Sequence, residues 1–515
     1  MLEQETMIPS FTNEDAGIAE LLDYMHEIED LKALGSLADW DQNTQMPEGA
    51  GEVRGHQSAT LQGVLHERWT NQSLGALLNK LNAVINRSGY TDADRGLVRE
   101  AQRNYDRATK LPRKLVEELA RVQAGSFEAW RRAREHNDFA SFAPWLSRTV
   151  SLQREVADHI GYAETRYDAL LDLFEPGMTA STLDTLFVPV REVSTTLLRR
   201  IEASSALVDD ACLQGEFSEE KQVALSEVLL RGMGYDFTHG AIAVSPHPFT
   251  TEFGSPFDVR LTVHPDKHFI QSSVMAAIHE GGHAVYEQGS APTLVRTPVA
   301  GGASMGMHES QSRLWENAIG RSEAYWRGQF AVVQQAFPEH FADIDAATFA
   351  RALNKVKPSL IRIEADEVTY NLHIIVRYEL EKAMINGDLA IESLPGRWNA
   401  KYREYLSIEP TSDSEGVLQD IHWSSGFGYF PSYTLGNLYS AQIYSALRQH
   451  YSNLDERLAG GDTAFILEWL RKNMYTFGAI YQPDTLMKRV AGETPNPAFF
   501  TRYLTGKFEA IYQLH

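Results

Sequence analysis

Two histidines four residues apart carry the strongest chemical signal in this sequence. The segment HEGGH at 279–283 lies in a stretch, 272–288, whose apolar residues recur at helical spacing. Histidines at positions i and i+4 project from one face of a helix and can share a divalent metal, while the glutamate between them can act on a water as a general base. The spacing therefore predicts a hydrolytic metal centre in which His279 and His283 are ligands and Glu280 is the base.

The same helix has a second face that can pack against the rest of the protein. Its apolar stripe consists of Val274, Ile278, Gly281, Gly282 and Val285. The polar residues of the segment therefore lie off the packed face and are available to bind a metal. A glycine inside a helix costs about 1 kcal/mol relative to alanine, so two in succession predict that another backbone approaches closely here.

A third ligand must come from another element, because a catalytic zinc usually takes three protein ligands and a water. Glu287 shares the helix face but lies about 12 Å along the axis from His279, which excludes it. The next helix is expected to begin at Gly306, after a loop at 289–306. Its first acid, Glu309, is the favoured ligand. The spacing leaves three alternatives open, namely His308, Glu316 and Glu323.

The acidic excess of the chain excludes several classes of partner. The 515 residues include 47 Lys and Arg against 69 Asp and Glu, for a formal net charge of -22. Nucleic acids and anionic membranes are polyanions, which proteins bind through clusters of basic residues. The charge therefore predicts no nucleic-acid partner and no membrane partner. The stretch 351–362 is basic and has no acid, which fits either a local positive site or a solvated helix face.

Cysteine usage and hydropathy bear on the compartment. Cys212 is the only cysteine, which excludes an intrachain disulfide and a thiolate metal site. The amino-terminal segment has no basic region followed by an apolar one, and no window approaches 18 uninterrupted apolar residues. The expected location is therefore the cytoplasm.

Helical periodicity dominates the chain and predicts a mainly α fold. Asn13 is the expected N-cap of the first helix. Further helical patterns run through 54–87, 92–135, 140–173, 181–204 and 218–233. Two short segments rich in Val, Phe and Thr, 240–253 and 258–263, predict a small sheet or hairpin.

The chain shows no internal repeat and no long Ser/Gly linker. Residues 1–515 are therefore expected to form a single domain, a large helical body with the small sheet inserted. Within it, we expect a helical lobe at about 1–235 and a catalytic part at about 236–515.

Six short motifs follow one another along the chain. They are HPF at 247–249, DVRLT at 258–262, HEGGH at 279–283, HESQ at 308–311, IRIEAD at 361–366 and GVLQDIHW at 416–423. In this order they resemble the motifs of the Taq-type thermostable metallocarboxypeptidases, which are gluzincins. The likeness extends to WDQ at 40–42 and FEPGM at 174–178 and so covers essentially the whole chain.

The resemblance implies that His279, His283 and Glu309 bind the metal and that Glu280 is the general base. The expected cofactor is Zn²⁺, with Co²⁺ as a possible substitute. The resemblance also implies a mostly helical fold with a narrow, deep groove, a small sheet beside the metal, and a homodimer.

Peptide hydrolysis requires further groups around a metal. The developing oxyanion needs hydrogen-bond donors, for which His422 and a tyrosine, Tyr433 or Tyr429, are the candidates. A guanidinium can bind a free α-carboxylate through two parallel hydrogen bonds. The resemblance gives this role to Arg362.

Other polar residues of the motifs have open roles. His247 and Arg260 are expected to bind substrate along the groove or to brace the site, although Asp258 could simply pair with Arg260. Asp366 and Asp420 could orient the metal-binding histidines. Capping and salt bridges are the alternative roles for these two acids.

The predicted function is a zinc metallocarboxypeptidase. It would release single amino acids, with broad specificity, from peptide substrates that have a free carboxyl terminus. A dipeptidyl-carboxypeptidase or an oligoendopeptidase could share the same metal chemistry, and Arg362 favours release of single residues. A non-catalytic metal-binding scaffold is the alternative from another class, and Glu280 argues against it because a site with ligands alone needs no base.

Overall fold

A computed structural model of the chain describes residues 8–12 and 14–514. In these residues, 21 α-helices accompany one three-stranded sheet. The prediction of a mainly α fold with a small sheet is therefore confirmed. None of the described helices is long and apolar enough to cross a bilayer.

The chain divides into two compact units, each built from three separated segments. Unit 1 comprises Met1–Thr109, Asp210–Leu353 and Ile443–Thr494, and unit 2 comprises Lys110–Asp209, Asn354–Gln442 and Pro495–His515. The single domain with a division near residue 235 stays a prediction.

Unit 1 contains the sheet and most of the helices. Its helices are α1 (Ala16–Thr44), α2 (Gly51–Trp69), α3 (Gln72–Asn82), α4 (Asp92–Lys110), α9 (Glu219–Met233), α10 (Ile270–Glu287), α11 (Met305–Arg313), α12 (Glu323–Ala336), α13 (Pro338–Phe341), α14 (Ala346–Ala352), α18 (Leu454–Ala459), α19 (Ala464–Asn473) and α20 (Pro483–Ala491). Its strands are β1 (Ile242–Val244), β2 (Thr250–Glu252) and β3 (Val259–Val263).

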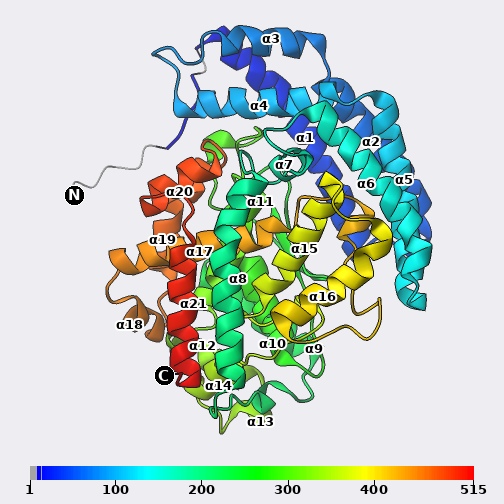
Figure 1. Cartoon of the computed structure of the whole chain (residues 1–515). Helices are drawn as coiled ribbons and strands as arrows, with labels where there is room; N and C mark the ends of the chain where they lie inside the picture. The colour runs from blue at the N-terminus through cyan, green and yellow to red at the C-terminus, as the bar shows by residue number, and fades with distance from the viewer. Residues whose placement is uncertain (1–7, 13, 515) are drawn as a thin grey trace. The chain divides into compact units, whose positions relative to one another are not determined.

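Unit 2 is built from long helices, of which α5 and α6 lie side by side in Figure 1. Its helices are α5 (Arg113–His136), α6 (Phe139–Ile160), α7 (Arg166–Asp172), α8 (Ala180–Glu202), α15 (Tyr370–Asn386), α16 (Leu394–Leu406) and α21 (Pro497–Tyr512). Helix α17 (Pro431–His450) begins in unit 2 and ends in unit 1.

Local capping explains where the helices start and stop. The side chain of Asp15 accepts hydrogen bonds from the first amides of α1; Asn13, the expected N-cap, lies outside the described residues. The predicted helical patterns between 54 and 173 are each broken into two helices. Asn71 caps α3, Pro112 has no N–H to continue α4, and Gly161 ends α6 at a φ of 89°. Apolar periodicity runs across these breaks, so it did not predict them.

The sheet has the order β1-β3-β2, which confirms the predicted small sheet. Strand β1 pairs parallel to β3, with Ile242 opposite Leu261, and β2 pairs antiparallel to β3, with Thr250 opposite Leu261. Val259, Leu261 and Val263 of β3 are buried, and the strand packs against α10. The sheet therefore supports the helix that carries the HEGGH segment.

Helix α10 is held between α9, α11 and the sheet. A Cβ atom on Gly282 would lie 2.6 Å from the main-chain oxygen of Gln311 on α11, so the predicted close approach of another backbone is confirmed there. At Gly281 the close neighbours are instead side chains of α9, since a Cβ would lie 2.7 Å from Leu230 and 2.8 Å from Met233. The two glycines thus let two helices pack tightly on α10.

In unit 2, one buried carboxylate holds the irregular segment that follows α16. Glu381 on α15 accepts a hydrogen bond of 2.8 Å from the indole N–H of Trp423 and one of 3.1 Å from the amide of Gly428. The Tyr167 hydroxyl donates to the same carboxylate at 2.7 Å. These contacts fix the ends of the stretch that begins at His422.

Candidate metal centre

His279, His283 and Glu309 come together in unit 1. The Oε2 atom of Glu309 lies 3.7 Å from Nε2 of His279 and 3.4 Å from Nε2 of His283. One donor atom from each residue lies within 4.8 Å of the others. Two ligands of one tetrahedral zinc, each at about 2.1 Å, are about 3.4 Å apart. The spacing therefore suits a single tetrahedral ion.

The donor set also fits a divalent metal chemically. Burial lowers the pKa of His283 to about 3, so this ring is neutral at pH 7. Burial alone would raise the pKa of Glu309, but Arg313 and the two histidines outweigh it and hold that pKa well below its usual range. Two imidazole nitrogens with one carboxylate are a donor set typical of catalytic zinc.

Glu309 is the one favoured ligand among four candidates, and the structure separates it from the other three. Helix α11 starts at Met305, capped by Ser304, and continues into a π-helical turn, η4 (Leu314–Ile319). Glu309 faces both histidines of the HEGGH segment. Glu323 instead pairs with Arg327 on the exposed start of α12.

Glu316 lies on η4 and orients His279. Its Oε2 atom is 2.8 Å from Nδ1 of His279, while Arg313 and Arg321 hold the same carboxylate at 3.2 and 3.1 Å. A carboxylate on Nδ1 directs Nε2 toward the metal and makes the ring a better ligand. Sequence reasoning weighed Glu316 only as a rival ligand. The missed signal was its spacing of seven residues from Glu309, which puts both acids on nearly one helix face.

His308 and Glu287 lie behind the second histidine. The Nδ1 atom of His308 is 2.5 Å from Nδ1 of His283, and its Nε2 atom is 2.6 Å from Oε1 of Glu287. Neither residue belongs to the group of donor atoms around Glu309. Glu287 was excluded as a ligand from helix geometry, and its carboxylate instead contacts His308.

Glu280 is buried beside the histidines and is held by the sheet. The hydroxyl of Thr250, on β2, lies 2.7 Å from Oε2 of Glu280 and 3.0 Å from its main-chain oxygen. Burial raises the pKa of Glu280, against the opposing effect of His279. A carboxylate with a raised pKa is a stronger base, as general-base catalysis near neutral pH requires.

His247 and Arg260 are less closely connected to this centre. Arg260 makes two hydrogen bonds of 2.8 Å with Asp258, and its guanidinium lies 4.5 Å from the ring centroid of Phe253. Asp258 and Arg260 thus form the salt bridge that the sequence left open as an alternative. The side chain of His247 is exposed. In the described part of the chain, no hydrogen bond or ion pair joins either residue to His279, His283 or Glu309.

A second group of predicted site residues comes together in unit 2. Arg362 is buried and contacts Oδ1 of Asp420 through Nε and Nη2, both at 3.0 Å. Arg377, which is 0% exposed, holds Oδ2 of the same carboxylate at 2.5 Å. The Arg362 guanidinium also lies 5.1 Å from the ring centroid of Tyr433. Asp420 is therefore in a salt bridge with two arginines.

His422, Tyr433 and Tyr429 belong to the same group. The Tyr433 hydroxyl lies 3.4 Å from Nε2 of His422, and the rings of His422 and Tyr429 are 5.9 Å apart. Burial lowers the pKa of His422 to about 4, with Asp420 acting in the opposite direction. His422 is therefore neutral at pH 7. Asp366 accepts from the amides of Val368 and Thr369 ahead of α15, which is the capping role considered from the sequence.

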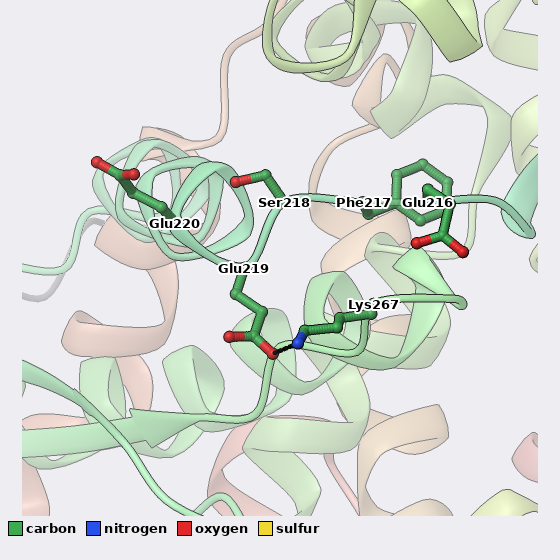
Figure 2. Close-up of a pocket in the computed structure, with 6 residues that line it drawn as sticks. All are labelled: Glu216, Phe217, Ser218, Glu219, Glu220 and Lys267. Atoms are coloured by element: carbon green, nitrogen blue, oxygen red, sulfur yellow. Dashed lines mark ion pairs between the residues drawn. The ribbon is translucent and has the colours of Figure 1, made fainter.

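Figure 2 shows a pocket of about 450 Å³ elsewhere in unit 1, at the start of α9. Its six lining residues are Glu216, Phe217, Ser218, Glu219, Glu220 and Lys267. Lys267 forms an ion pair of 3.5 Å with Glu219 across it. None of the predicted site residues lines this pocket.

Comparisons with known proteins agree with the chemistry of these groups. The family model described as "Carboxypeptidase Taq (M32) metallopeptidase" matches residues 20–508. The chain is 39% identical to thermostable carboxypeptidase 1 of Thermus thermophilus, with 97% of this chain and 99% of the relative covered. It is 36% identical to carboxypeptidase 1 of Bacillus subtilis, with 96% and 98% covered.

A solved structure shows the same fold. The crystal structure of an M32 carboxypeptidase from Deinococcus radiodurans superimposes with a TM-score of 0.93 at 36% identity. The match covers 97% of this chain and 100% of that one.

Proposed function

We propose that this chain, which belongs to the carboxypeptidase Taq (M32) metallopeptidase family, uses zinc to release single amino acids from the carboxyl ends of peptides. Its family makes it a metal-dependent carboxypeptidase, and so a hydrolase. The proposal adds the metal, the roles of the residues and a broad tolerance of side chains. The observation that carries it is the convergence of His279, His283 and Glu309 beside the buried carboxylate of Glu280.

In the proposed site, His279, His283 and Glu309 hold Zn²⁺, for which Co²⁺ can substitute. When bound, such an ion supplies a nucleophilic water at neutral pH and polarises the substrate carbonyl. Glu280 accepts the proton of the attacking water and delivers it to the departing amine. Thr250 supports this role because its hydroxyl, 2.7 Å away, limits the orientations of the carboxylate.

Arg362 is proposed to bind the α-carboxylate of the substrate. Asp420 contacts Nε and Nη2 of its guanidinium, and Nη1 lies 3.4 Å from the hydroxyl of Tyr370. A guanidinium edge such as Nη1–Nη2 can bind a carboxylate through two parallel hydrogen bonds, and in this proposal the substrate replaces the long contact with Tyr370. Two fixed carboxylate contacts would orient the last peptide bond and favour removal of one residue at a time.

His422 and Tyr433 are proposed to donate hydrogen bonds to the developing oxyanion, with Tyr429 as the other tyrosine candidate. The neutral state of His422 supports this role, since a neutral imidazole carries one N–H donor. Arg260 and His247 are proposed to contact the peptide upstream of the cleaved bond. We further propose that the protein forms a homodimer and is located in the cytoplasm. We also propose that it binds neither nucleic acid nor membranes, because a net charge of -22 disfavours both of these polyanionic partners.

The test is mass spectrometry of a short peptide incubated with the zinc-loaded chain. We expect a ladder of single-residue losses from the carboxyl end. Glu280→Ala and Arg362→Ala should suppress it, while Arg397→Ala, which removes an exposed arginine of α16, should not. Activity that survives Glu280→Ala, or release of dipeptides alone, would overturn the proposal.

A further inference from the structure

The two metal-binding histidines have different partners on their second ring nitrogen. For His279, the partner of Nδ1 is the carboxylate of Glu316 at 2.8 Å. For His283, the partner of Nδ1 is another imidazole, that of His308, at 2.5 Å. Carboxylates, backbone carbonyls and waters are the usual partners of a metal-binding histidine. His279 therefore contacts a carboxylate directly, whereas a second imidazole lies between His283 and its carboxylate.

The positions of the protons in this chain follow from the ligand role of His283. Its Nε2 atom faces Glu309 and must carry a lone pair to bind a metal, so the proton of the neutral ring is on Nδ1. That N–H then donates to Nδ1 of His308, which must accept. The remaining proton of His308 is consequently on Nε2, from which it donates to Oε1 of Glu287 at 2.6 Å. Each donor in the chain has one acceptor.

The surrounding loop keeps these side chains in place. A Cβ on Gly302 would lie 2.9 Å from Cδ2 of His308, and a Cβ on Gly301, whose φ is +77°, would lie 3.0 Å from Oε2 of Glu287. The ring of Tyr286 packs on His308 with centroids 5.5 Å apart. Glu287 is itself buried. The loop therefore packs closely against both side chains.

From these contacts we infer that His308 and Glu287 are positioning residues that orient His283 for the metal through the hydrogen-bonded chain Glu287–His308–His283. The inference rests on the proposed metal site and assigns a purpose to the histidine of the HESQ motif. It also explains why Glu287, on the same helix face as the proposed ligands, can be buried. Its carboxylate accepts a hydrogen bond from His308, which lies 21 residues further along the chain. The carboxylate of Glu287 is the final acceptor of this chain, whereas Glu316 accepts directly from His279.

The test measures zinc affinity of the full-length, chelator-stripped chain by competition with a colorimetric chelator, without any peptide. His308→Leu removes both hydrogen bonds and should weaken zinc binding by about 10- to 100-fold. His308→Gln can still accept from His283 and donate to Glu287, so it should recover most of that loss. Glu287→Gln keeps an acceptor but removes the charge, and should weaken binding by less than His308→Leu does.

Tyr286→Phe is the matched control, since it keeps the ring that packs on His308. It should bind zinc as the wild type does. Wild-type affinity in His308→Leu would overturn the inference, as would a His308→Gln variant as weak as His308→Leu. If His308→Leu does not fold, Glu287→Gln decides, because unchanged affinity in that variant overturns the chain.

The outcome is separable from that of the proposed function. A chain that binds zinc with the expected order of variants but releases no amino acid overturns only the proposed function. A wild-type chain whose zinc affinity equals that of His279→Ala overturns the metal site and this inference together.

Discussion

The Oε2 atom of Glu316 lies 2.8 Å from Nδ1 of His279, on a π-helical turn seven residues beyond Glu309. Glu309 and Glu316, two acids of one continuous helical segment, thus lie beside different nitrogens of the His279 ring. Because a π-helical turn shifts the register of a helix, such turns are frequent at functional sites. The contact between Glu316 and His279 should therefore affect the affinity for the metal.

Glu316→Ala should weaken zinc binding by about 10- to 100-fold, because His279 loses the acceptor that orients it. Chelator competition measures the change. Glu323→Ala is the control, since this acid of the same region pairs with the exposed side chain of Arg327. Equal affinities in the two variants would contradict the assigned role of Glu316.

Metal removal should lower both activity and thermal stability. A ligand present at about 100 times its dissociation constant adds about 2.7 kcal/mol to the free energy of unfolding. Calorimetry of the stripped chain should therefore show a melting temperature that rises as zinc is added, with activity returning in parallel. Zinc or cobalt should restore activity. In His279→Ala the zinc-dependent rise should be absent, and its persistence would place the metal elsewhere.

Asp420→Ala should destabilise the protein by about 3–5 kcal/mol, because it leaves the buried guanidinium groups of Arg362 and Arg377 without their shared counter-charge. Urea denaturation measures the loss. The matched control is Asp158→Ala, which breaks an exposed two-bond pair with Arg166 in the same unit. That change should cost less than about 1 kcal/mol. Similar losses of unfolding free energy in both variants would contradict the role of Asp420 as the counter-charge of two buried arginines.

Stability should fall in acid through His422. Burial lowers its pKa from 6.5 to about 4 in the folded protein, so between these values the unfolded chain binds more protons. The contribution to the free energy of unfolding is therefore complete above pH 6.5 and is lost as the pH falls to 4. Its upper limit is about 3 kcal/mol. His422→Gln should flatten the stability profile over this window, whereas His136→Gln, at an exposed position of α5, should leave it unchanged. An unaltered profile in His422→Gln would refute the expectation.

The net charge should influence which peptides are captured. A charge of -22 attracts cationic peptides over long distances, although the proposed contact of Arg362 is with a carboxylate. At low ionic strength, kcat/KM should be higher for Lys-rich than for Glu-rich peptides with the same last residue. The difference should shrink in high salt, since 1 M salt screens charges beyond about 3 Å. A preference that does not respond to salt would point to direct side-chain contacts.

Helix geometry made part of the site predictable. A repeat of 3.6 residues per turn puts His279 and His283 on one face, whatever the rest of the chain does. The same periodicity excluded Glu287 as a ligand and located α10 and α11 to within two residues. It failed at the breaks near Asn71, Pro112 and Gly161, because apolar spacing there continues through the residues that end one helix and start the next.

The sequence by itself determined the pair of histidines, the glutamate between them, and the glycine that allows α11 to approach α10. These depend on contacts within one helix or on the absence of a side chain. Only the tertiary structure decided that Glu316 serves His279, that His308 and Glu287 stand behind His283, and that Asp420 joins Arg362 to Arg377. Partners far apart in the sequence meet only where packing brings their helices together, and no local periodicity encodes that meeting.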